Sequence, residues 1–365
     1  MVHPENDSKY KGLIVNKGVS QPPSVNPYRV KRKKNILHSS DEYVEGILAG
    51  DMVVLSRAVT LIESSLSEHN SLAQEIIEKC LPHSGNSVRV GITGVPGAGK
   101  STSIDSFGMY LLNKGHKVAV LAIDPSSERS KGSILGDKTR MEKLSVEKNA
   151  FIRPSPSSGS LGGVARKTRE IIILCEAAGF DYIFVESVGV GQSETAVHSM
   201  VDFFLLIQLS GTGDELQGIK RGIMEMADGI VINKADGDNI DRANIARRQL
   251  KNALHLYPLP DSGWAPEVLT YSGYYNIGIA EVWDMIGRYI DFVKENGYFY
   301  YKRNEQYKYR MYETINEHLH RRFYGNTVVV EHLKKLENDV IEHKKSSYAA
   351  AKEALEIYDN LLSKT

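Results

Sequence analysis

Residues Gly94–Ser101 form the motif G-x-x-x-x-G-K-S, and they come directly after an apolar run, Val88–Ile92. Glycines in such a loop allow the backbone to wrap around an anion so that successive N–H groups point inward. The β-branched residues before the motif favour a strand, and the segment from Ser101 to Asn113 favours a helix that ends at Gly115. Strand, loop and helix in this order predict a phosphate loop. A glycine-rich turn that binds nothing is the alternative that this setting disfavours.

The motif also predicts which residues contact a bound nucleoside triphosphate. Lys100 is long enough to reach the outer phosphates, and the Ser101 hydroxyl is a suitable oxygen ligand for Mg²⁺. The N–H groups of the loop backbone surround the polyphosphate. The expected nucleotide-binding residues of this segment are Gly94, Val95, Pro96, Gly97, Ala98, Gly99, Lys100, Ser101 and Thr102.

Short apolar strands alternate with helices beyond this motif, which predicts a mostly parallel α/β sheet covered by helices on both faces. Amphipathic helices precede the first strand, and after Asn276 the sequence favours helices alone. We therefore expect a P-loop NTPase fold with an N-terminal helical cap and a C-terminal helical extension. The expected strands are 88–94, 118–124, 182–187, 203–209, 229–233 and 268–272, and the expected helices between them include 161–178 and 240–255.

The composition disfavours several classes of partner. The 365 residues include 45 Lys and Arg and 45 Asp and Glu, so no net field favours nucleic acid or an anionic membrane. No apolar stretch approaches the roughly 20 residues that span a bilayer, and the N-terminus lacks the apolar centre of a secretory signal. Cys80 and Cys175 are isolated, which argues against disulfides and structural zinc and favours a reducing, cytoplasmic compartment.

A second motif, Asn233-Lys234-Ala235-Asp236, follows an apolar strand and predicts the identity of the base. A carboxylate such as Asp236 accepts hydrogen bonds from both N1–H and the exocyclic amine of guanine, whereas adenine has no such donor pair. We expect Asn233 to brace the loop and Lys234 to lie over the base plane. A plain turn is the alternative, but the position of the motif after a phosphate loop favours GTP over ATP.

Ser272 and Gly273 come after the next expected strand. They stand where a further backbone contact to the guanine O6 is expected. We therefore include both residues among the predicted nucleotide-binding residues.

Three acidic residues are candidates for a magnesium site. Asp124 ends one expected strand, Asp137 lies in the loop that follows, and Glu186 ends another strand. Such residues converge at the carboxyl edge of a parallel sheet, and their oxygens suit Mg²⁺. We predict that Asp124, Asp137 and Glu186 join Ser101 in the metal site, directly or through water. A helix cap is the alternative for Asp124, which precedes Pro125.

Longer motifs resemble those of one family, the MeaB/ArgK/MMAA family of P-loop GTPases. The resemblance covers roughly residues 41–322 and is carried by the segments 124–127, 132–141, 186–194, 213–220 and 233–238. It implies a G-protein chaperone of methylmalonyl-CoA mutase or a related acyl-CoA mutase. Such a chaperone gates the delivery of adenosylcobalamin, a cofactor that the mutase holds and this chain does not, and protects the mutase from inactivation.

The resemblance also implies roles for individual residues. Asp124 and Asp137 belong to a first switch, Glu186 and Gly189 to a second switch, and residues 213–220 to a third. Lys220 in this third switch resembles a lysine that moves toward the phosphates when the partner binds. One departure is Leu209-Ser210-Gly211, which stands where family members commonly have a proline before the glycine.

The domain boundaries follow from the pattern and the resemblance together. Residues 1–39 are expected to be a poorly ordered polar tail rather than a targeting or docking arm. Residues 40–84 form a helical cap, 85–296 the P-loop GTPase domain, and 297–365 a C-terminal helical arm through which two copies dimerise. The aromatic segment Tyr298–Tyr301 begins this arm and is expected at a hinge or an interface, or packed on its own domain.

The second switch predicts slow intrinsic hydrolysis, because Val190 occupies the place of the familiar glutamine after Gly189. The Gly189 N–H is expected to hold the γ-phosphate. Gln192 either orients the attacking water or holds the switch loop, and the sequence leaves both open. Partner binding is expected to bring a cation to the phosphates and to stimulate turnover. The predicted catalytic residues are Lys100, Glu186, Gln192 and Lys220.

Two other functions are consistent with parts of the sequence. A kinase that phosphorylates a transport protein is an activity attributed to ArgK relatives, but a guanine-reading Asp236 argues against ordinary ATP use. A nickel-delivery GTPase needs a His-rich tract or closely spaced Cys and His, and the 11 histidines are scattered. The identity of the client mutase is left open.

Overall fold

The central element of the protein is a parallel β-sheet, seen here in a computed structural model that describes residues 39–64, 66–123, 141–154, 161–187, 193–210 and 221–363. Within these ranges the sheet has seven strands in the order β3-β2-β4-β1-β5-β6-β7, and every pairing is parallel. The strands are β1 (Val88–Gly94), β2 (Val118–Ile123), β3 (Ala150–Arg153), β4 (Tyr182–Ser187), β5 (Phe203–Leu209), β6 (Gly229–Asn233) and β7 (Glu267–Thr270). The predicted α/β fold class is confirmed.

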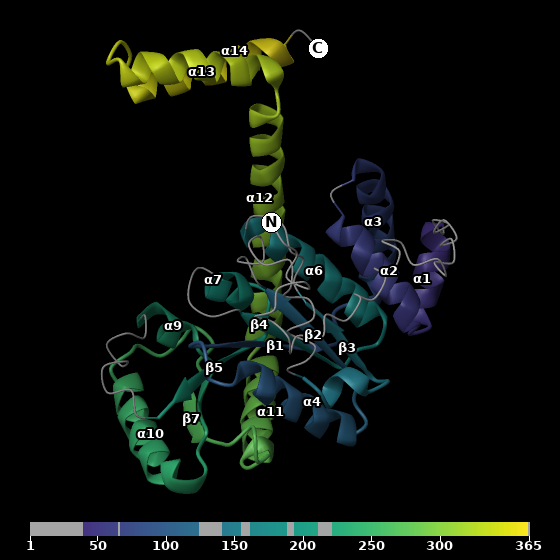
Figure 1. The fold of residues 1–365 in the computed structure, drawn as a ribbon, viewed down its shortest axis with the longest axis vertical. Coiled ribbons are helices and arrows are strands. Elements are labelled where there is room, and N and C mark those ends of the chain that lie inside the picture. Colours follow the sequence, from purple (N-terminus) through teal and green to yellow (C-terminus); the bar gives the residue numbers. More distant parts are fainter. Residues whose placement is uncertain are drawn as a thin grey trace, which may run out of the picture. The chain divides into compact units, whose positions relative to one another are not determined.

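Helices cover both faces of the sheet (Figure 1). Successive side chains of a strand point to opposite faces, so on β4 Ile183 and Val185 pack with α6 and α7, whereas Phe184 packs with α4 and α11. The N-terminal helices pack against α6, and α9 and α10 pack on the β5–β7 side. These helices are α1 (Ser40–Leu48), α2 (Met52–Glu63), α3 (Ser67–Cys80), α4 (Lys100–Asn113), α6 (Leu161–Ala177), α7 (Ser193–His198), α9 (Arg221–Met226), α10 (Ile240–Leu254) and α11 (Ile279–Glu295), with 3₁₀ turns η3 (Leu81–His83), η5 (Leu144–Val146) and η6 (Gly237–Asn239).

Three helices follow the sheet domain: α12 (Tyr298–Tyr324), α13 (Thr327–Ile341) and α14 (Ser347–Leu362). The last two pack together through Leu336, Ala350 and Ala354, with Phe323 of α12 against this cluster. Tyr298–Tyr301 forms the first turn of α12, where Phe299 is buried and its neighbour Tyr300 is exposed.

Two details of the sheet differ from the sequence-based expectation. Strand β3 was not predicted, because Ala150–Arg153 offers only three apolar residues after a charged stretch. Strand β7 covers Glu267–Thr270 rather than 268–272, since Tyr271 and Ser272 already belong to the loop beyond it. No helix of the described residues is long and apolar enough to cross a membrane.

Helix α12 is bound to the amino edge of the sheet by a buried ion pair. Arg303 Nη2 donates to Asp202 Oδ2 at 2.7 Å and Nε donates to Oδ1 at 2.8 Å, just before β5 begins. The same guanidinium donates to the carbonyl oxygens of Gly85 and Ser87. Burial opposes the ionised form of Asp202, but hydrogen bonds and charge from Arg303 and Arg89 lower the pKa of its carboxyl.

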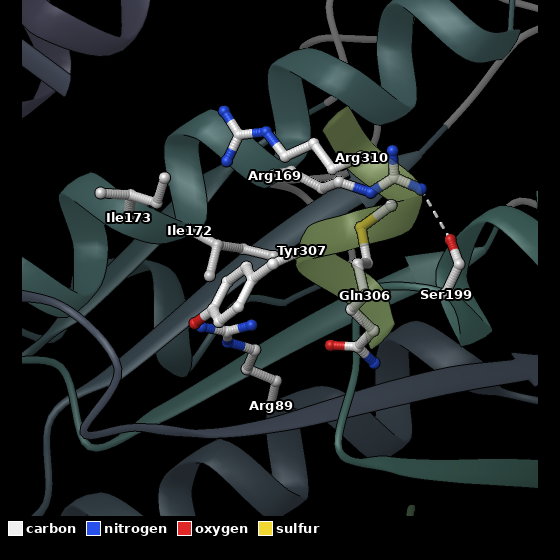
Figure 2. A pocket seen from close by; sticks show the side chains of 9 residues that line it. Arg89, Arg169, Ile172, Ile173, Ser199, Gln306, Tyr307 and Arg310 are labelled. Atoms are coloured by element: carbon white, nitrogen blue, oxygen red, sulfur yellow. Dashed lines mark hydrogen bonds between the residues drawn. The ribbon is translucent and has the colours of Figure 1, made fainter. Parts of the chain in front are cut away.

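A small cavity of about 30 Å³ lies beside this ion pair, between α6 and α12. Figure 2 shows Arg89, Arg169 and Arg310 around it, with the guanidinium of Arg169 donating to Ser199 Oγ at 2.7 Å. Acidic residues balance these charges, since Arg89 pairs with Glu176, Arg169 with Glu313 and Arg310 with Glu170. The cavity lies at the amino ends of the strands, away from the edge that carries the phosphate loop.

Replacing Arg303 by Met is expected to destabilise the fold by about 3–5 kcal/mol, because the buried carboxylate of Asp202 loses the guanidinium that pairs with both of its oxygens. The free energy of unfolding at neutral pH, measured by urea denaturation, tests this. Because the pKa of folded Asp202 is lowered, the pair stabilises the fold above the pKa of an unfolded Asp, and the stabilisation is lost as the pH falls through the folded pKa.

Arg288→Met is the matched control, because the pair of Arg288 with Glu267 is exposed and is expected to contribute less than about 1 kcal/mol. Equal losses in the two variants would contradict a special role for the buried pair.

Candidate nucleotide-binding site

The phosphate loop connects the end of β1 to the first turn of α4, and two of its glycines are required by their surroundings. A Cβ at Gly94 would lie 2.3 Å from the carbonyl oxygen of Ile207 on the neighbouring strand β5. Gly99 has φ +88°, and a Cβ there would lie 2.5 Å from Asn233 Nδ2. The glycines of the motif therefore permit close contact with β5 and with the base-reading loop, in addition to access for phosphate.

Lys100 is the first residue of α4, and its side chain folds back over the phosphate loop. Its Nζ donates to the carbonyl oxygen of Gly94 at 2.9 Å and lies 3.4 Å from that of Val95. The ammonium group is therefore held across the loop that it is predicted to serve. Its contact with the outer phosphates stays a prediction.

Two of the predicted metal ligands lie within hydrogen-bonding distance of each other. Ser101 Oγ donates to Glu186 Oε1 at 3.2 Å. Glu186 is near the carboxyl end of β4, in register with Ile92 of β1 and Ala122 of β2, and only 7% of it is exposed. A hydroxyl and a carboxylate are the hard oxygen ligands that Mg²⁺ prefers, so this pair fits the ion.

The other predicted metal ligands, Asp124 and Asp137, lie outside the described residues. Within the described residues, no group of three His, Cys, Asp or Glu side chains is placed to hold a metal ion. Of the four predicted metal ligands, Ser101 and Glu186 are the two that lie within the described residues. Gly189, Gln192 and Lys220 also lie outside the described ranges.

Asn233, the last residue of β6, joins three loops through its side-chain amide. Its Nδ2 donates to the carbonyl oxygen of Ala98 in the phosphate loop at 2.8 Å. Its Oδ1 accepts from the N–H of Lys234 at 2.8 Å and from the N–H of Gly273 at 3.0 Å. The Gly273 N–H thus already has an acceptor, and a contact with guanine O6 would have to share it.

The carboxylate of Asp236, which is predicted to contact the base, is held by the loop after β7. Ser272 Oγ donates to Asp236 Oδ2 at 2.5 Å, which fixes the orientation of a side chain predicted to accept from guanine. Lys234, between Asn233 and Asp236, has φ +59°, a left-handed conformation that turns the chain sharply after β6. The described residues that are predicted to bind phosphate and to contact the base therefore lie at one edge of the sheet.

Comparison with known proteins identifies the family of the chain. Residues 55–328 match the family described as "Methylmalonyl Co-A mutase-associated GTPase MeaB". The chain belongs to the MeaB family of GTPases. Membership of this family establishes that the chain is a GTPase that binds GTP. The family is associated with methylmalonyl-CoA mutase.

Individual relatives extend the likeness over most of the chain. A Mycobacterium tuberculosis protein described as a probable GTPase is 48% identical over 321 residues, covering 87% of this chain and 96% of the relative. The mouse "Methylmalonic aciduria type A homolog, mitochondrial" is 43% identical, covering 82% of this chain and 75% of the relative. A crystal structure described as "LAO/AO transport system kinase" is 35% identical with a TM-score of 0.72, covering 89% of this chain and 99% of that chain.

The structure adds residues of this MeaB-family site that sequence reasoning missed. Ser103 Oγ and the Tyr271 hydroxyl are 2.5 Å apart, and Ser106 Oγ donates to the carbonyl oxygen of Gly273 at 2.5 Å. Burial raises the pKa of the Tyr271 phenol, so it stays protonated. The two serine contacts attach the loop after β7 to α4. The spacing of Ser103 and Ser106 places them on one helix face, which was a weak signal in the sequence.

Replacing Asp236 by Asn is expected to weaken GDP binding about 100-fold, because the amide can no longer accept from both N–H groups of guanine. The variant should gain affinity for xanthosine diphosphate, whose O2 accepts from the new amide. Isothermal titration calorimetry with both nucleotides measures the two effects.

Asp238→Asn is the matched control, since Asp238 is exposed and lies two residues away in η6. Similar affinities of the Asp236 and Asp238 variants for GDP would show that Asp236 does not read the base.

Proposed function

We propose that this chain is a G-protein chaperone of methylmalonyl-CoA mutase or a related acyl-CoA mutase, and that it works in the cytoplasm. It uses GTP binding and hydrolysis to gate the delivery of adenosylcobalamin to the mutase and to protect it from inactivation. The observation that carries this proposal is the MeaB family match across residues 55–328. The joined phosphate and base loops at Asn233 and the relative named for methylmalonic aciduria support it.

The proposed metal site consists of Ser101 and Glu186 together with Asp124 and Asp137. These residues would hold a Mg²⁺ ion, which would offset negative charge on the outer phosphates. Lys100 adds a second positive charge from its position over the phosphate loop. Support comes from the hydrogen bond between Ser101 and Glu186, which places two hard oxygens together beside the loop.

The proposed hydrolytic residues lie in the second and third switches. The Gly189 N–H holds the γ-phosphate, and Gln192 orients the attacking water or holds the switch loop. Lys220 approaches the phosphates when the mutase binds and stabilises the charge that develops during phosphoryl transfer. The presence of Val190 after Gly189 is the basis for a slow rate without the partner.

We also propose that two copies dimerise through residues 297–365. The support is a row of exposed apolar side chains on α12, where Met311, Ile315 and Leu319 follow one another at helical spacing. Such a row on a long helix is typical of a surface that another chain covers. The proposed division into a cap at 40–84, a GTPase domain at 85–296 and this arm follows the same reasoning.

Two alternative functions have weaker support. The solved relative described as a transport system kinase raises the possibility of protein phosphorylation, which transfer of labelled phosphate from GTP to an acceptor protein would reveal. Nickel delivery lacks support in the described residues, where no set of three metal-binding side chains comes together.

Purified methylmalonyl-CoA mutase is expected to raise the GTPase rate, and Lys220→Ala is expected to reduce the stimulated rate about 100-fold, because it removes the cation that stabilises the transition state. Phosphate release with and without the mutase measures this, and GDP affinity should be unchanged. Lys251→Ala, on the exposed surface of α10, is the control. Full stimulation of the Lys220 variant would rule out this role, and the absence of a response to any mutase would rule out the chaperone function.

Replacing Glu186 by Gln is expected to lower the GTPase rate about 10- to 100-fold and to raise the Mg²⁺ concentration needed for half-maximal rate. The amide keeps the size of the side chain but removes the charge beside Ser101. Titration of GTP hydrolysis with Mg²⁺ tests this, with the exposed Asp241→Asn of α10 as control. An unchanged Mg²⁺ dependence would place Glu186 outside the metal site.

A further inference from the structure

Two tyrosines expose their rings on the loop that follows β7. Tyr274 is 76% exposed and Tyr275 is 61% exposed. Their ring centroids are 4.9 Å apart and the ring planes meet at 86°, an edge-to-face contact. Neither ring is used in the site described above, although the pair directly follows Gly273 in the sequence.

The loop that carries the two rings is closed by backbone hydrogen bonds. Ser272 N donates to Ile277 O at 2.9 Å, and Ile277 N donates to Ser272 O at 3.1 Å. Within the loop, Tyr275 N donates to Ser272 Oγ at 3.3 Å, and Asn276 adopts the left-handed conformation with φ +55°. The aromatic pair is therefore presented by a tight loop whose conformation is set before any ligand binds.

The same loop is attached to the base-reading residues. Gly273 is held on both sides, since its N–H donates to Asn233 Oδ1 and its carbonyl accepts from Ser106 Oγ. Ser272 Oγ holds Asp236. Tyr274 is the next residue along the chain, so its Cα lies about 3.8 Å from that of Gly273. The tyrosine pair is thus continuous with the guanine-recognition site.

A purine bound beside this loop needs apolar side chains near it that keep water away from its hydrogen bonds. Hydrogen bonds between guanine and a carboxylate are strong only where water is kept away from them. A purine also has a π-face that stacks on aromatic rings whatever its edge substituents are. An exposed tyrosine at the edge of the site supplies both the cover and the stacking surface.

We propose that Tyr274 packs its ring against the purine face of bound GTP and GDP, as a nucleotide-recognition residue in addition to the motif residues. Tyr275 is a positioning residue that supports the Tyr274 ring through the edge-to-face contact. The proposal rests on the GTP-binding site of this family and is independent of the chaperone function.

Isothermal titration calorimetry with GDP and inosine diphosphate tests the proposal. Tyr274→Ala should weaken both nucleotides by about the same factor, roughly 10-fold, because stacking does not depend on the 2-amino group that inosine lacks. Tyr274→Phe should retain the wild-type affinities. Tyr275→Ala should give a smaller loss, which Tyr275→Phe restores. Tyr348→Ala, at an exposed tyrosine of α14, is the control and should change nothing.

Three results would overturn the proposal. Wild-type affinity of Tyr274→Ala for both nucleotides would assign the tyrosines to a protein surface instead. Equal losses in the Phe and Ala variants would point to the hydroxyl, and a loss for GDP alone would point to reading of the base edge. Asp236→Asn measured in parallel reports guanine recognition itself, so a failure of the Tyr274 proposal is distinguishable from a failure of the site.

Discussion

The side-chain amide of Asn233 is the interaction on which the nucleotide site depends. It holds Ala98 of the phosphate loop, Lys234 of the base-reading loop and Gly273 of the loop after β7. These three segments are far apart in sequence, and Asn233 is the one side chain described above that contacts all three. Asn233 is buried at the end of β6, so its position is set by the sheet. The loops predicted to bind guanine and phosphate are therefore joined by one amide group.

Much of the fold was predictable because its signals are local. The alternation of strands and helices and the apolar run before Gly94 predict a parallel sheet with a phosphate loop, and the structure has both. The strand order was not predictable, since the pairing of β1 with β4 and β5 depends on contacts between distant segments. Strand β3 was missed because four residues carry too little pattern to distinguish a strand from a loop.

The candidate site was predictable as a set of motifs but not as a network. The spacing of Asn233 and Asp236 predicts contacts with a base, yet nothing in it predicts that Ser272 holds Asp236 or that Ser106 holds Gly273. Those bonds join residues whose separation in sequence carries no periodicity. The exposure of Tyr274 was equally beyond sequence reasoning, because burial depends on what packs around a side chain.

Strand β5 makes close contacts with other elements at both of its ends. At the carboxyl end, the carbonyl oxygen of Ile207 lies so close to Gly94 that no side chain fits between the two strands. At the amino end, Asp202 forms a buried ion pair with Arg303 of α12. The strand is about 20 Å long for seven residues, with the phosphate loop at one end and helix α12 at the other. A shift of β5 along its own axis would disturb both contacts at once.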